Sequence, residues 1–504
     1  MKSLDQIAAE LQGYDPQALH ADKVNEFLAQ LVEPVKAQEQ VAIFDALGRV
    51  LAADVMSPVN VPPHDNSAMD GYACSGEALA NGLPLTLKVI GTALAGAAWR
   101  GSVLPGECLK IMTGAVMPHG LDTVVPQEFV QESAAGLPTA GSTVTSTFIT
   151  IPPNLLRQGD NRRARGEDIQ KGQAALRQGD RLTPAALGLL ASLGLQHVLV
   201  WRRLRVAYFS TGDEILSLGE APREGAVYDS NRYTVFGLLA RLGVQMIDMG
   251  VVRDEPAALE AAFTSAAQIS DAIITSGGVS VGEADHTKAM MQKLARLGAD
   301  GHDGRELNSA AAGGVAFWRV AMRPGRPMAV GRLPRQPGFV ALQPDLTGKN
   351  TICPRPAYIV RYNYYSNTNR DGFSDNCADV RSFDADGHAI LFGLPGNPVA
   401  VMVTFLAFVR PALLRMMGST EAAPPLLQAT SLEAIRKKPG RTEYQRGIVT
   451  TRADGQLIAS LIGNQGSGVL SSMTQANGLI VLSHDQGNIA AGDLVNVMMF
   501  DGVI

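Results

Sequence analysis

Three carboxylates that each follow a predicted strand have the types and spacing for chemistry with a divalent cation. Glu214 comes after the strand RVAYFS, Asp254 after QMIDMGVV, and Asp285 in the loop after DAIITS. Because parallel strands end at one edge of a sheet, we expect the three side chains to converge there. Converging carboxylates repel one another unless cations neutralise them, and Mg²⁺ accepts one or two carboxylates together with substrate phosphates. The sequence therefore predicts a Mg²⁺ site; the alternative for Asp254 is a helix N-cap before Pro256.

Two turns that contain glycine follow the first and the third of these strands. The first turn contains Thr211 and Gly212, and the second contains Ser276, Gly277, Gly278 and Ser280. Glycine lets the backbone turn with its N–H groups pointing at a ligand, and the start of the next helix adds positive potential. These turns favour phosphate binding, and the alternative is that they are only tight turns.

The segment FWRVAMRPGRP brings the basic side chains of Arg319, Arg323 and Arg326 close together. The alternation of apolar and polar residues in WRVAMR predicts a strand. Arginine beside a Gly-Pro turn can hold an oxyanion through two parallel hydrogen bonds. The segment therefore favours an oxyanion site, and the alternative is a solvated strand edge.

The string LFGLPGNP predicts a strand, a rigid turn between Pro395 and Pro398, and a helix with Asn397 as its N-cap. The turn could add a ligand contact. Two further polar strings, DNSAMDGY at 65–72 and IMTGA at 111–115, lie between apolar strands. Taken as local sequence, both predict turns held by side-chain to backbone hydrogen bonds.

Composition bounds the class of protein. The chain has 504 residues, a formal charge of −5 and 46% hydrophobic residues, which excludes disorder of the whole chain. No run of Lys and Arg dominates, so a broadly basic nucleic-acid surface is excluded. Four Cys without a C-x-x-C pair fit a reducing compartment. The N-terminus lacks the apolar core of a signal peptide and no apolar stretch is long enough for a span, so we expect a cytoplasmic protein without a membrane anchor.

The length of the chain and the order of its predicted strands and helices predict a multidomain α/β plus β protein of three or four domains. Residues 54–163 carry short apolar runs between Gly/Pro turns and predict a β-rich domain, while 1–53 and 164–203 form a helical and extended connecting domain. Residues 204–422 alternate strands and helices, which predicts a central doubly wound, mostly parallel sheet with helices on both faces. Residues 423–504 predict a small β-barrel-like domain with a hairpin that turns at 453–455.

Residues 332–389 break this alternation. They are rich in Asn, Asp, Arg, Pro and Tyr and show no sustained period. A loop of this length inside a compact domain is uncommon and is usually functional or disordered. We predict a surface insertion in the α/β domain, and the alternative is a lid or a partner-binding segment.

Eleven strings that cover nearly the whole chain outside the insertion resemble one family, in its order. They include HDNSAMDGYA (64–73), IMTGAVMP (111–118), RARGEDI (163–169), STGDEI (210–215), YDSNRY (228–233), TSGGVSVGEADHT (275–287), FGLPGNPVA (392–400) and PGRTEYQRG (439–447). On these strings the chain resembles the molybdopterin molybdotransferases, the family of MoeA and of the C-terminal domain of gephyrin.

The resemblance implies an enzyme that inserts molybdate into the dithiolene of adenylylated molybdopterin, with loss of AMP and with Mg²⁺ as cofactor, to give molybdenum cofactor. It implies a molybdopterin-binding type of α/β domain and an elongated homodimer that the connecting domain helps to form. The active cleft would lie between the α/β domain of one subunit and the β-rich domain of the other. Implied protein partners are a molybdopterin adenylyltransferase and the molybdoenzymes that accept the cofactor, with no nucleic acid and no membrane.

Functional positions of the family carry over where its motifs match this sequence. The resemblance gives catalytic roles to Asp70, Thr113, Asp168, Glu214, Asp254 and Asp285, with the last three holding the metal. It gives ligand-binding roles to Thr211, Gly212, Ser276, Gly277, Gly278, Ser280, Arg319, Arg323, Pro395, Pro398, Arg446 and Ser467. Asp70, Thr113 and Asp168 would face the site from the partner subunit.

The chain departs from the family pattern at the arginines and at the insertion. The family commonly has Lys where this chain has Arg319, Arg323 and Arg326. Because Arg stays charged, the change keeps oxyanion binding and excludes a task that needs a neutral amine. The resemblance says nothing about the insertion, which could gate the site or bind a partner.

Three other functions stay open at this point. The sister activity, adenylylation of molybdopterin, uses a similar α/β domain, but the flanking β-regions argue against it. A relative that selects tungstate is a second alternative. A scaffold protein that binds partners through the same fold is the third, and the intact acidic set argues for retained chemistry.

Overall fold

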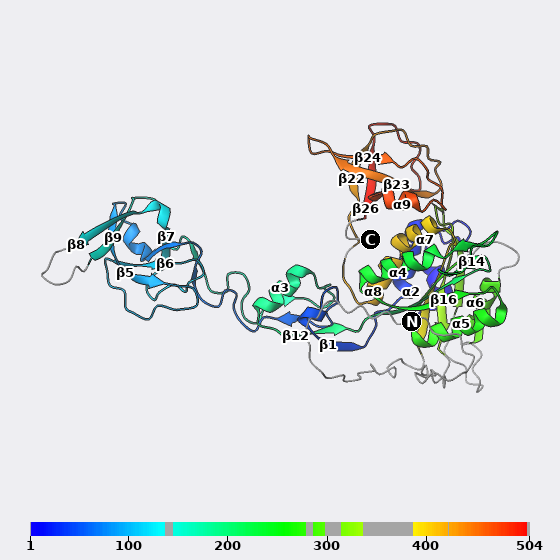
Figure 1. The fold of residues 1–504 in the computed structure, drawn as a ribbon, viewed down its shortest axis with the longest axis horizontal. Coiled ribbons are helices and arrows are strands. Elements are labelled where there is room, and N and C mark those ends of the chain that lie inside the picture. Colours follow the sequence, from blue (N-terminus) through cyan, green and yellow to red (C-terminus); the bar gives the residue numbers. More distant parts are fainter. Residues whose placement is uncertain are drawn as a thin grey trace.

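The structure is a computed structural model that describes residues 2–136, 145–278, 286–297, 314–335, 387–421 and 423–500. Figure 1 shows an elongated molecule, with a β-rich sheet at one end, a small connecting body in the middle, and an α/β domain with a barrel at the other end. Two residues of the predicted site, Ser280 and Asp285, lie outside the described residues. The multidomain α/β plus β architecture is as predicted.

The α/β domain is built on a six-stranded sheet. Its order is β16 (Gln245–Val252), β13 (Arg205–Thr211), β17 (Ala272–Ser276), β21 (His388–Leu394), β20 (Pro327–Pro334) and β18 (Gly314–Arg319). The first four strands are parallel, and β20 and β18 add antiparallel edges. Along β13, Val206 and Tyr208 face one hydrophobic cluster while Ala207 and Phe209 face another, so both faces of the sheet are covered.

Helices cover the two faces in the doubly wound manner. The helices α4 (Ser230–Leu242), α7 (Pro398–Thr404) and α8 (Arg410–Met416) pack in one cluster, and α5 (Pro256–Ile269) and α6 (His286–Leu297) pack in the other. A π-helical turn, Phe405–Val409, joins α7 to α8. The combined stretch Pro398–Met416 is apolar and long enough to cross a membrane, but 89% of it is buried inside the protein, as expected of a core helix.

The N-terminal helices belong to this α/β core, which differs from the division that we predicted. The helices α1 (Leu4–Glu10) and α2 (Ala21–Leu31) bury Ile7, Val24 and Phe27 in the cluster that also contains α4 and α8. The fully buried Arg332 fixes them to β20, because its guanidinium donates to the Leu31 carbonyl over 2.7 Å and to the Lys2 carbonyl. The connecting body therefore begins only after α2.

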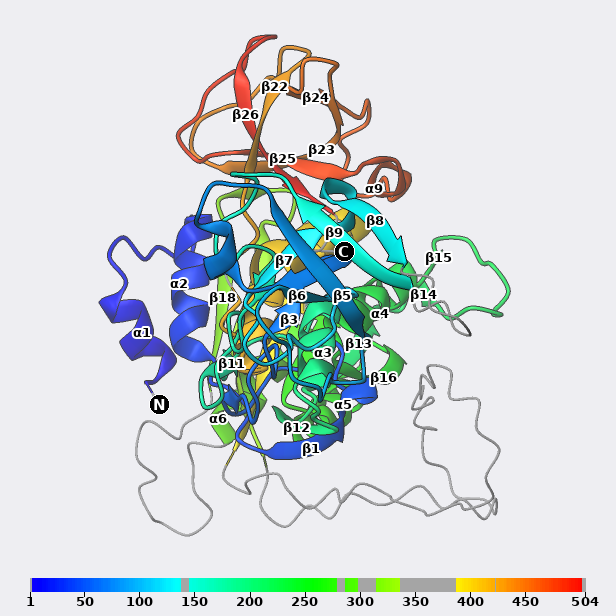
Figure 2. The same cartoon turned by 90° about the vertical axis from the view of Figure 1, so that its left-hand side faces the viewer.

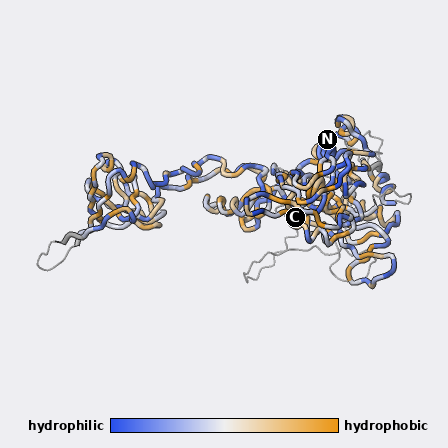
Figure 3. The backbone as a smooth tube through the Cα atoms, turned by 90° about the horizontal axis from the view of Figure 1, so that it is seen from above, coloured by the Kyte–Doolittle hydropathy of each residue, from blue (hydrophilic) through white to orange (hydrophobic). Residues whose placement is uncertain are grey.

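The connecting body consists of the antiparallel pair β1 (Gln38–Ala42) and β12 (His197–Trp201), a short 3₁₀ turn (Ile43–Asp45) and α3 (Pro184–Ser192). Two chain segments leave it side by side, as Figures 1 and 3 show. They pair as β2 (Val55–Met56) with β11 (Ala174–Leu176) and as β3 (Asn66–Ser67) with β10 (Arg162–Arg163). We call residues 54–178 the arm.

The end of the arm is a six-stranded sheet that stands in front of the α/β domain in Figure 2. Its order is β7 (Thr123–Pro126), β4 (Gly71–Cys74), β6 (Glu107–Ile111), β5 (Leu85–Ala93), β9 (Thr145–Ile151) and β8 (Gln131–Gly136). Two clusters of buried residues, one around Tyr72 and one around Ile111, form its own core. The predicted β-rich domain is therefore an independently packed unit.

The C-terminal domain is a closed five-stranded barrel. Its strands are β22 (Leu427–Ser431), β23 (Thr442–Thr451), β24 (Leu457–Leu461), β25 (Gly478–Leu482) and β26 (Leu494–Met499). The short helix α9 (Ser471–Gln475) lies between β24 and β25 in the chain. The hairpin of β23 and β24 turns where predicted, with Gly455 at φ +85°. The strand β19 (Met322–Arg323) of the α/β domain pairs with β23 and so joins the two domains.

The insertion is shorter than predicted, because its two ends belong to strands. β20 continues to Pro334 and β21 begins at His388, and these two residues are opposite one another in an antiparallel ladder. Residues 332–334 and 388–389 are thus strand residues at the amino edge of the sheet, where β20 ends and β21 begins. The rest of the predicted insertion, 336–386, lies outside the described residues.

The arm sheet should depend on Gly71, where a Cβ atom would lie 2.0 Å from the Val125 carbonyl oxygen of the neighbouring strand. Gly71→Ala should destabilise the arm by about 3 kcal/mol or more, because two paired strands would have to separate. Calorimetry should show the arm transition lowered by at least about 10 °C.

Gly188→Ala is the matched control, because Gly188 is exposed in α3 and a Cβ there meets no atom within 4 Å. This change should leave stability equal or higher by up to about 1 kcal/mol, since Ala favours helix. An arm transition unchanged in Gly71→Ala would contradict the packing described.

Candidate active site at the carboxyl edge of the sheet

The parallel sheet has a topological switch point between β13 and β17. These strands are neighbours, but the chain leaves β13 toward α4 on one face and leaves β17 toward α6 on the other. In doubly wound sheets this divergence opens a crevice beyond the carboxyl ends of the strands, where ligands bind. Both predicted glycine turns lie at this point, directly after Thr211 and Ser276.

The glycines of the two turns are required by close approach of other groups. A Cβ on Gly277, at φ +92°, would lie 2.5 Å from the Thr211 carbonyl oxygen, and one on Gly278, at φ +65°, would lie 2.4 Å from Thr287 Oγ1. A Cβ on Gly212 would lie 2.5 Å from Glu214 Oε2. The structure therefore brings the two turns together with Glu214. The Gly277 N–H donates to the Leu394 carbonyl over 3.2 Å, so this amide holds the turn against β21.

Acidic side chains gather at the same edge. Asp254 accepts a 3.4 Å hydrogen bond from the Thr287 hydroxyl, and its backbone N–H donates to Asp213 Oδ1 over 3.4 Å. The N-cap of α5 is Glu255 and not Asp254, so the N-cap alternative for Asp254 is wrong. Asp213 was missed by the sequence analysis, although it lies between Gly212 and Glu214 in the same turn.

The donor set at this edge suits a hard cation. Asp213, Glu214 and Asp254 offer carboxylate oxygens that are exposed or half-exposed, and oxygen ligands of this kind are those that Mg²⁺ prefers. Within the described part of the chain, no group of three His, Cys, Asp or Glu side chains is already arranged around one metal position. These residues fit a cation that also takes oxygens from its substrate.

A buried chain of hydroxyls supports the second glycine turn from below. Tyr208 Oη lies 2.7 Å from Ser276 Oγ, Ser276 Oγ lies 3.2 Å from Ser210 Oγ, and the Ser210 hydroxyl donates to Asp229 Oδ1 over 2.9 Å. Burial raises the pKa of Asp229, which also caps α4 by accepting from the Arg232 N–H. Ser276 is thus buried and bonded within the protein, and its side chain holds the turn in place.

Asp229 and Asn231 were not predicted, although an Asp directly before a helical run is a recognisable N-cap signal. Asn231 Nδ2 donates to the Gly396 carbonyl over 2.7 Å, and a Cβ on Gly396 would lie 4.0 Å from the Gly277 Cα. The turn between Pro395 and Pro398 therefore lies against the second glycine turn. Asn397 is the N-cap of α7 and Pro398 its first residue, as predicted.

The barrel reaches this edge through Ser467. Its hydroxyl accepts a 3.1 Å hydrogen bond from Asn397 Nδ2, and its carbonyl accepts one from the Val399 N–H over 3.1 Å. A Cβ on Gly468 would lie 4.0 Å from Asn397 Oδ1. The structure thus brings Ser467 together with the turn at Pro395 and Pro398.

The predicted basic groups separate into exposed and buried arginines. Arg319 ends β18, Arg323 lies in β19, and both are exposed, as is Arg326. Arg446 is only 1% exposed, and it donates to Ser472 Oγ and to the carbonyls of Asn464 and Gly466 over 2.9–3.1 Å. Burial and then repulsion by Arg323 lower the pKa of Arg446. Arg446 thus lies near Arg323 but holds the barrel loop that carries Ser467.

The remaining predicted residues lie in the arm. Asp70 Oδ1 accepts hydrogen bonds from the Thr113 hydroxyl and N–H, each over 2.7 Å, and these bonds lower the pKa of the Asp70 carboxyl. Asp168 is exposed, and its N–H donates to Val61 in the paired segments of the arm. Within one chain the arm sheet and the α/β domain are at opposite ends of the molecule (Figure 1), so the chain does not bring these residues to Glu214.

Comparison with known families covers most of the chain. It matches the MoeA N-terminal region (domain I and II) over residues 19–194, a probable molybdopterin binding domain over 207–415, and the MoeA C-terminal region (domain IV) over 428–500. The middle match contains the switch point, and the outer matches contain the arm and the barrel.

Individual relatives agree with the family matches. A molybdopterin molybdenumtransferase of Haemophilus influenzae is 34% identical over 95% of this chain and 98% of its own length. One of Nostoc is 31% identical over 97% of this chain and 95% of its own. A gephyrin of Dictyostelium discoideum is 27% identical over 92% of this chain and 59% of its own. The crystal structure of a molybdopterin biosynthesis MoeA protein from Pyrococcus horikoshii superposes with a TM-score of 0.62 at 26% identity, covering 96% and 99% of the two chains.

Arg446→Met should unfold the barrel loop rather than merely remove a charge. The change removes the buried guanidinium that donates to the Asn464 and Gly466 carbonyls, which should cost about 1–3 kcal/mol of stability. Thermal unfolding of the purified protein measures this. Arg323→Met is the matched control, because Arg323 is exposed, and it should change stability by less than about 0.5 kcal/mol. Equal stability of the two variants would contradict a holding role for Arg446.

Proposed function

The chain belongs to the MoeA family of molybdopterin molybdenumtransferases, and we propose that it inserts molybdate into adenylylated molybdopterin with release of AMP to give molybdenum cofactor. The observation that carries the proposal is the convergence at the switch point. There the glycine turns lie together with Glu214 and Asp254, and the turn at Asn397 connects them to Ser467 of the barrel. A phosphoanhydride and an oxyanion both need such a site, with acidic groups for a cation and donors for anions.

The acidic groups would act on the phosphoanhydride. We propose that Glu214 and Asp254, together with Asp285, hold Mg²⁺ at the edge of the sheet, with Asp213 close beside them. When bound there, Mg²⁺ neutralises the charge that develops on the anhydride oxygens as AMP leaves. Gly212, Gly277 and Gly278 let the two turns lie close against Glu214, Thr211 and Thr287, and we propose that the substrate phosphate binds beside these turns.

Molybdate would be held by the exposed arginines. Arg319 and Arg323 lie on the segment that joins the α/β domain to the barrel, since β19 pairs with β23. Each guanidinium group can donate two parallel hydrogen bonds to an oxyanion, and neither residue is buried. Ser467 would add a donor from the barrel, and Arg446 supports that loop from inside. This division differs from the prediction, which placed Arg446 among the groups that contact the ligand.

We propose a homodimer in which the arm of one subunit completes the site of the other. The Asp70 and Thr113 cluster lies far from Glu214 in the same chain, so a second copy is needed to bring the two together. The connecting body carries exposed apolar side chains that a partner could cover, namely Phe44 at 95%, Leu47 at 54% and Leu199 at 40% exposure. A cytoplasmic location, a molybdopterin adenylyltransferase as supplier and molybdoenzymes as acceptors remain parts of the same proposal.

The sister adenylylation reaction is less well supported, because the matches include the arm and the barrel as well as the molybdopterin-binding domain. Incubation with molybdopterin and ATP in the absence of an adenylylating enzyme distinguishes the two. Formation of adenylylated molybdopterin and pyrophosphate by this chain would favour the adenylylation reaction over the proposed one.

Asp285→Ala should abolish molybdate-dependent AMP release, because the acidic set would lose a cation ligand. Release is measured on adenylylated molybdopterin with and without molybdate, and Mg²⁺ chelation of the native protein should give the same loss. Glu260→Ala is the control, because it also removes a carboxylate from the α/β domain. The Glu260 carboxylate pairs with Lys293 between α5 and α6 and does not belong to the acidic set at the carboxyl edge. Full activity of Asp285→Ala would remove the metal role.

Arg323→Ala should raise the molybdate concentration that gives half-maximal AMP release by about tenfold or more, because one charge-assisted anion contact is lost. Arg323→Lys should recover part of the loss, since lysine keeps the charge without the planar fork. Competition by tungstate, measured in the same assay, reports the oxyanion preference. An unchanged molybdate dependence in Arg323→Ala would contradict oxyanion binding at this arginine.

A further inference from the structure

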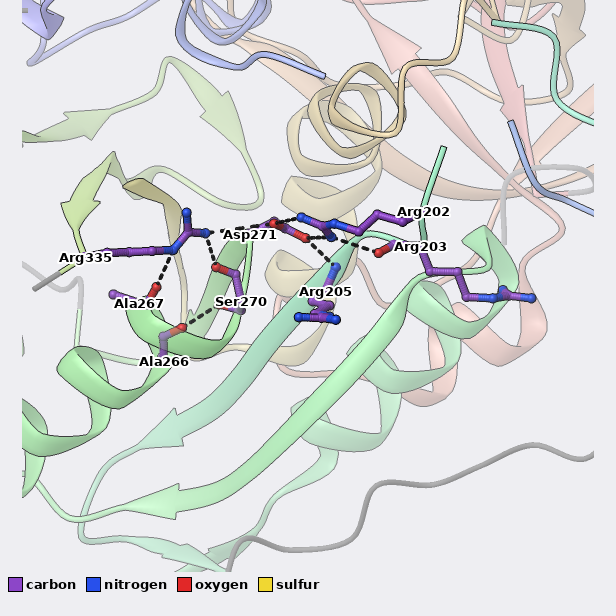
Figure 4. Close-up of polar contacts among 8 residues, drawn as sticks. All are labelled: Arg202, Arg203, Arg205, Ala266, Ala267, Ser270, Asp271 and Arg335. Atoms are coloured by element: carbon purple, nitrogen blue, oxygen red, sulfur yellow. Dashed lines mark hydrogen bonds and ion pairs between the residues drawn. The ribbon is translucent and has the colours of Figure 1, made fainter. Parts of the chain in front are cut away.

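The connecting body, and through it the arm, is attached to the α/β domain at the amino edge of the sheet, opposite to the edge that carries the glycine turns. We call residues 201–205 at this attachment the root. Here residues 201–205 pass from β12 of the connecting body into β13 of the α/β domain. Figure 4 shows the side chains of Arg202 and Arg335 approaching Asp271 from opposite sides, with the backbone of Arg205 close by. Asp271 directly precedes β17, so the root and the second glycine turn are the two ends of one buried strand.

Asp271 is a buried residue, 7% exposed, and both oxygens of its carboxylate accept hydrogen bonds. Arg202 donates to both of its oxygens, Nη1 to Oδ2 and Nη2 to Oδ1, each over 2.7 Å. The Arg205 N–H donates to Oδ2 over 2.8 Å. Arg335 lies 3.9 Å from Oδ1 and also donates to the carbonyls of Ala267 and Ser270. The hydrogen bonds from Arg202 and Arg205 therefore tie the root to the start of β17.

Other elements fix the neighbouring residues of the root. Arg203 Nη1 donates to the Gly243 carbonyl over 2.9 Å, and Arg49 Nη2 donates to the Trp201 carbonyl over 2.8 Å. A Cβ on Gly418, at the end of α8, would lie 2.7 Å from the Trp201 indole. The root is thus held from β17, from the end of α4, from the connecting body and from the end of α8.

A buried bidentate ion pair contributes more to the relative orientation of the two segments that it joins than to the free energy of folding. Removing two charges from water costs about as much as their attraction returns, so apolar residues of similar volume are often no less stable. Apolar surfaces can slide over one another, whereas the two parallel bonds of a guanidinium and a carboxylate fix both distance and orientation. At this position the pair sets the angle between the α/β domain and the connecting body, from which the arm extends.

Building on the proposed function, we infer that Arg202 and Asp271 are positioning residues that aim the arm at the active site of a second copy. Asp70 and Thr113 flank β4 and β6 in the sheet that ends the arm, so a rotation at the root is amplified along the arm before it reaches them. A displacement of about 1 Å at reacting groups is enough to lower a rate a hundredfold. The pair would thus act on the reaction in the partner's site, from the sheet edge opposite to the glycine turns of its own chain.

The test variant is Arg202→Met combined with Asp271→Asn. This combination removes both charges of the bidentate pair. Arg335 keeps its hydrogen bonds to the Ala267 and Ser270 carbonyls, and the asparagine oxygen still accepts from the Arg205 N–H, so the α/β domain should stay folded. Arg202→Lys is the conservative variant, which keeps an ion pair but loses the fork. Lys293→Met is the matched control, because it removes an exposed ion pair with Glu260 on the same domain.

Heterodimers with two different tags separate the arm from the site. One chain carries Asp70→Ala and the other carries Glu214→Ala, so a shared-site heterodimer keeps one intact site. That site uses the α/β edge of the Asp70→Ala chain and the arm of the Glu214→Ala chain. The test variant is then placed in either chain, and molybdate-dependent AMP release is measured together with the thermal unfolding temperature.

Placed in the Glu214→Ala chain, the test variant should lower AMP release at least tenfold, because it frees the only useful arm. Placed in the Asp70→Ala chain, it should leave release within twofold. Arg202→Lys should give an intermediate loss in the first arrangement, and Lys293→Met should give no loss in either. Equal losses in both arrangements, or no loss in either, would overturn the positioning role.

The same experiment keeps the underlying proposal separate. Native protein that releases no AMP in response to molybdate refutes the proposed function. Native protein that is active while the plain heterodimer of Asp70→Ala and Glu214→Ala is inactive refutes the shared site, and the positioning role with it.

Discussion

The divergence of β13 and β17 is the constraint on which the ligand-directed groups of the α/β domain depend. These neighbouring strands turn to opposite faces, and the two turns come so close that Gly277 has no room for a side chain beside Thr211. The same crowding places the starts of α4 and α7 at one point, where Asn231 bonds to the Gly396 carbonyl. The positions of the carboxylates and the barrel contact at Ser467 follow from this arrangement of backbone.

Buried polar groups hold this edge, while exposed ones face the substrate. Tyr208 and Ser210 lie beneath the second glycine turn and bond with Ser276, and Asp229 accepts from Ser210. Arg446 likewise bonds to carbonyls of the barrel loop. Such groups are costly to bury unless every partner is in place, so they fix one geometry. Glu214 and Arg323 keep their charges toward solvent, where a ligand can replace water. The residue types are alike in both sets, and burial alone separates support from contact.

Periodicity and turn chemistry were enough to predict the parallel strands, the helices between them and the hairpin of the barrel, because these are local properties of the chain. They were also enough to place Glu214 and Asp254 at one sheet edge. Tertiary packing decided the rest. Arg446 has the right type for an anion site, but β23 buries it. Asp254 stands one residue too early to cap α5, and Asp213 joins it only because β13 and β16 end side by side. The domain of α1 and α2 is set by Arg332, three hundred residues away in sequence.

That last contact bears on the order in which the chain can fold as it is synthesised. The arm sheet is built from residues 71–151 and has its own core, so it can close early. The first helices cannot, because their packing partners include β18 and the final turns of α8, which are made much later. Contacts so distant in sequence carry a high entropic cost and form slowly. Val24 and Phe27 can therefore reach their native burial only after the chain has passed Met416, so the first helices made are among the last to gain their packing partners.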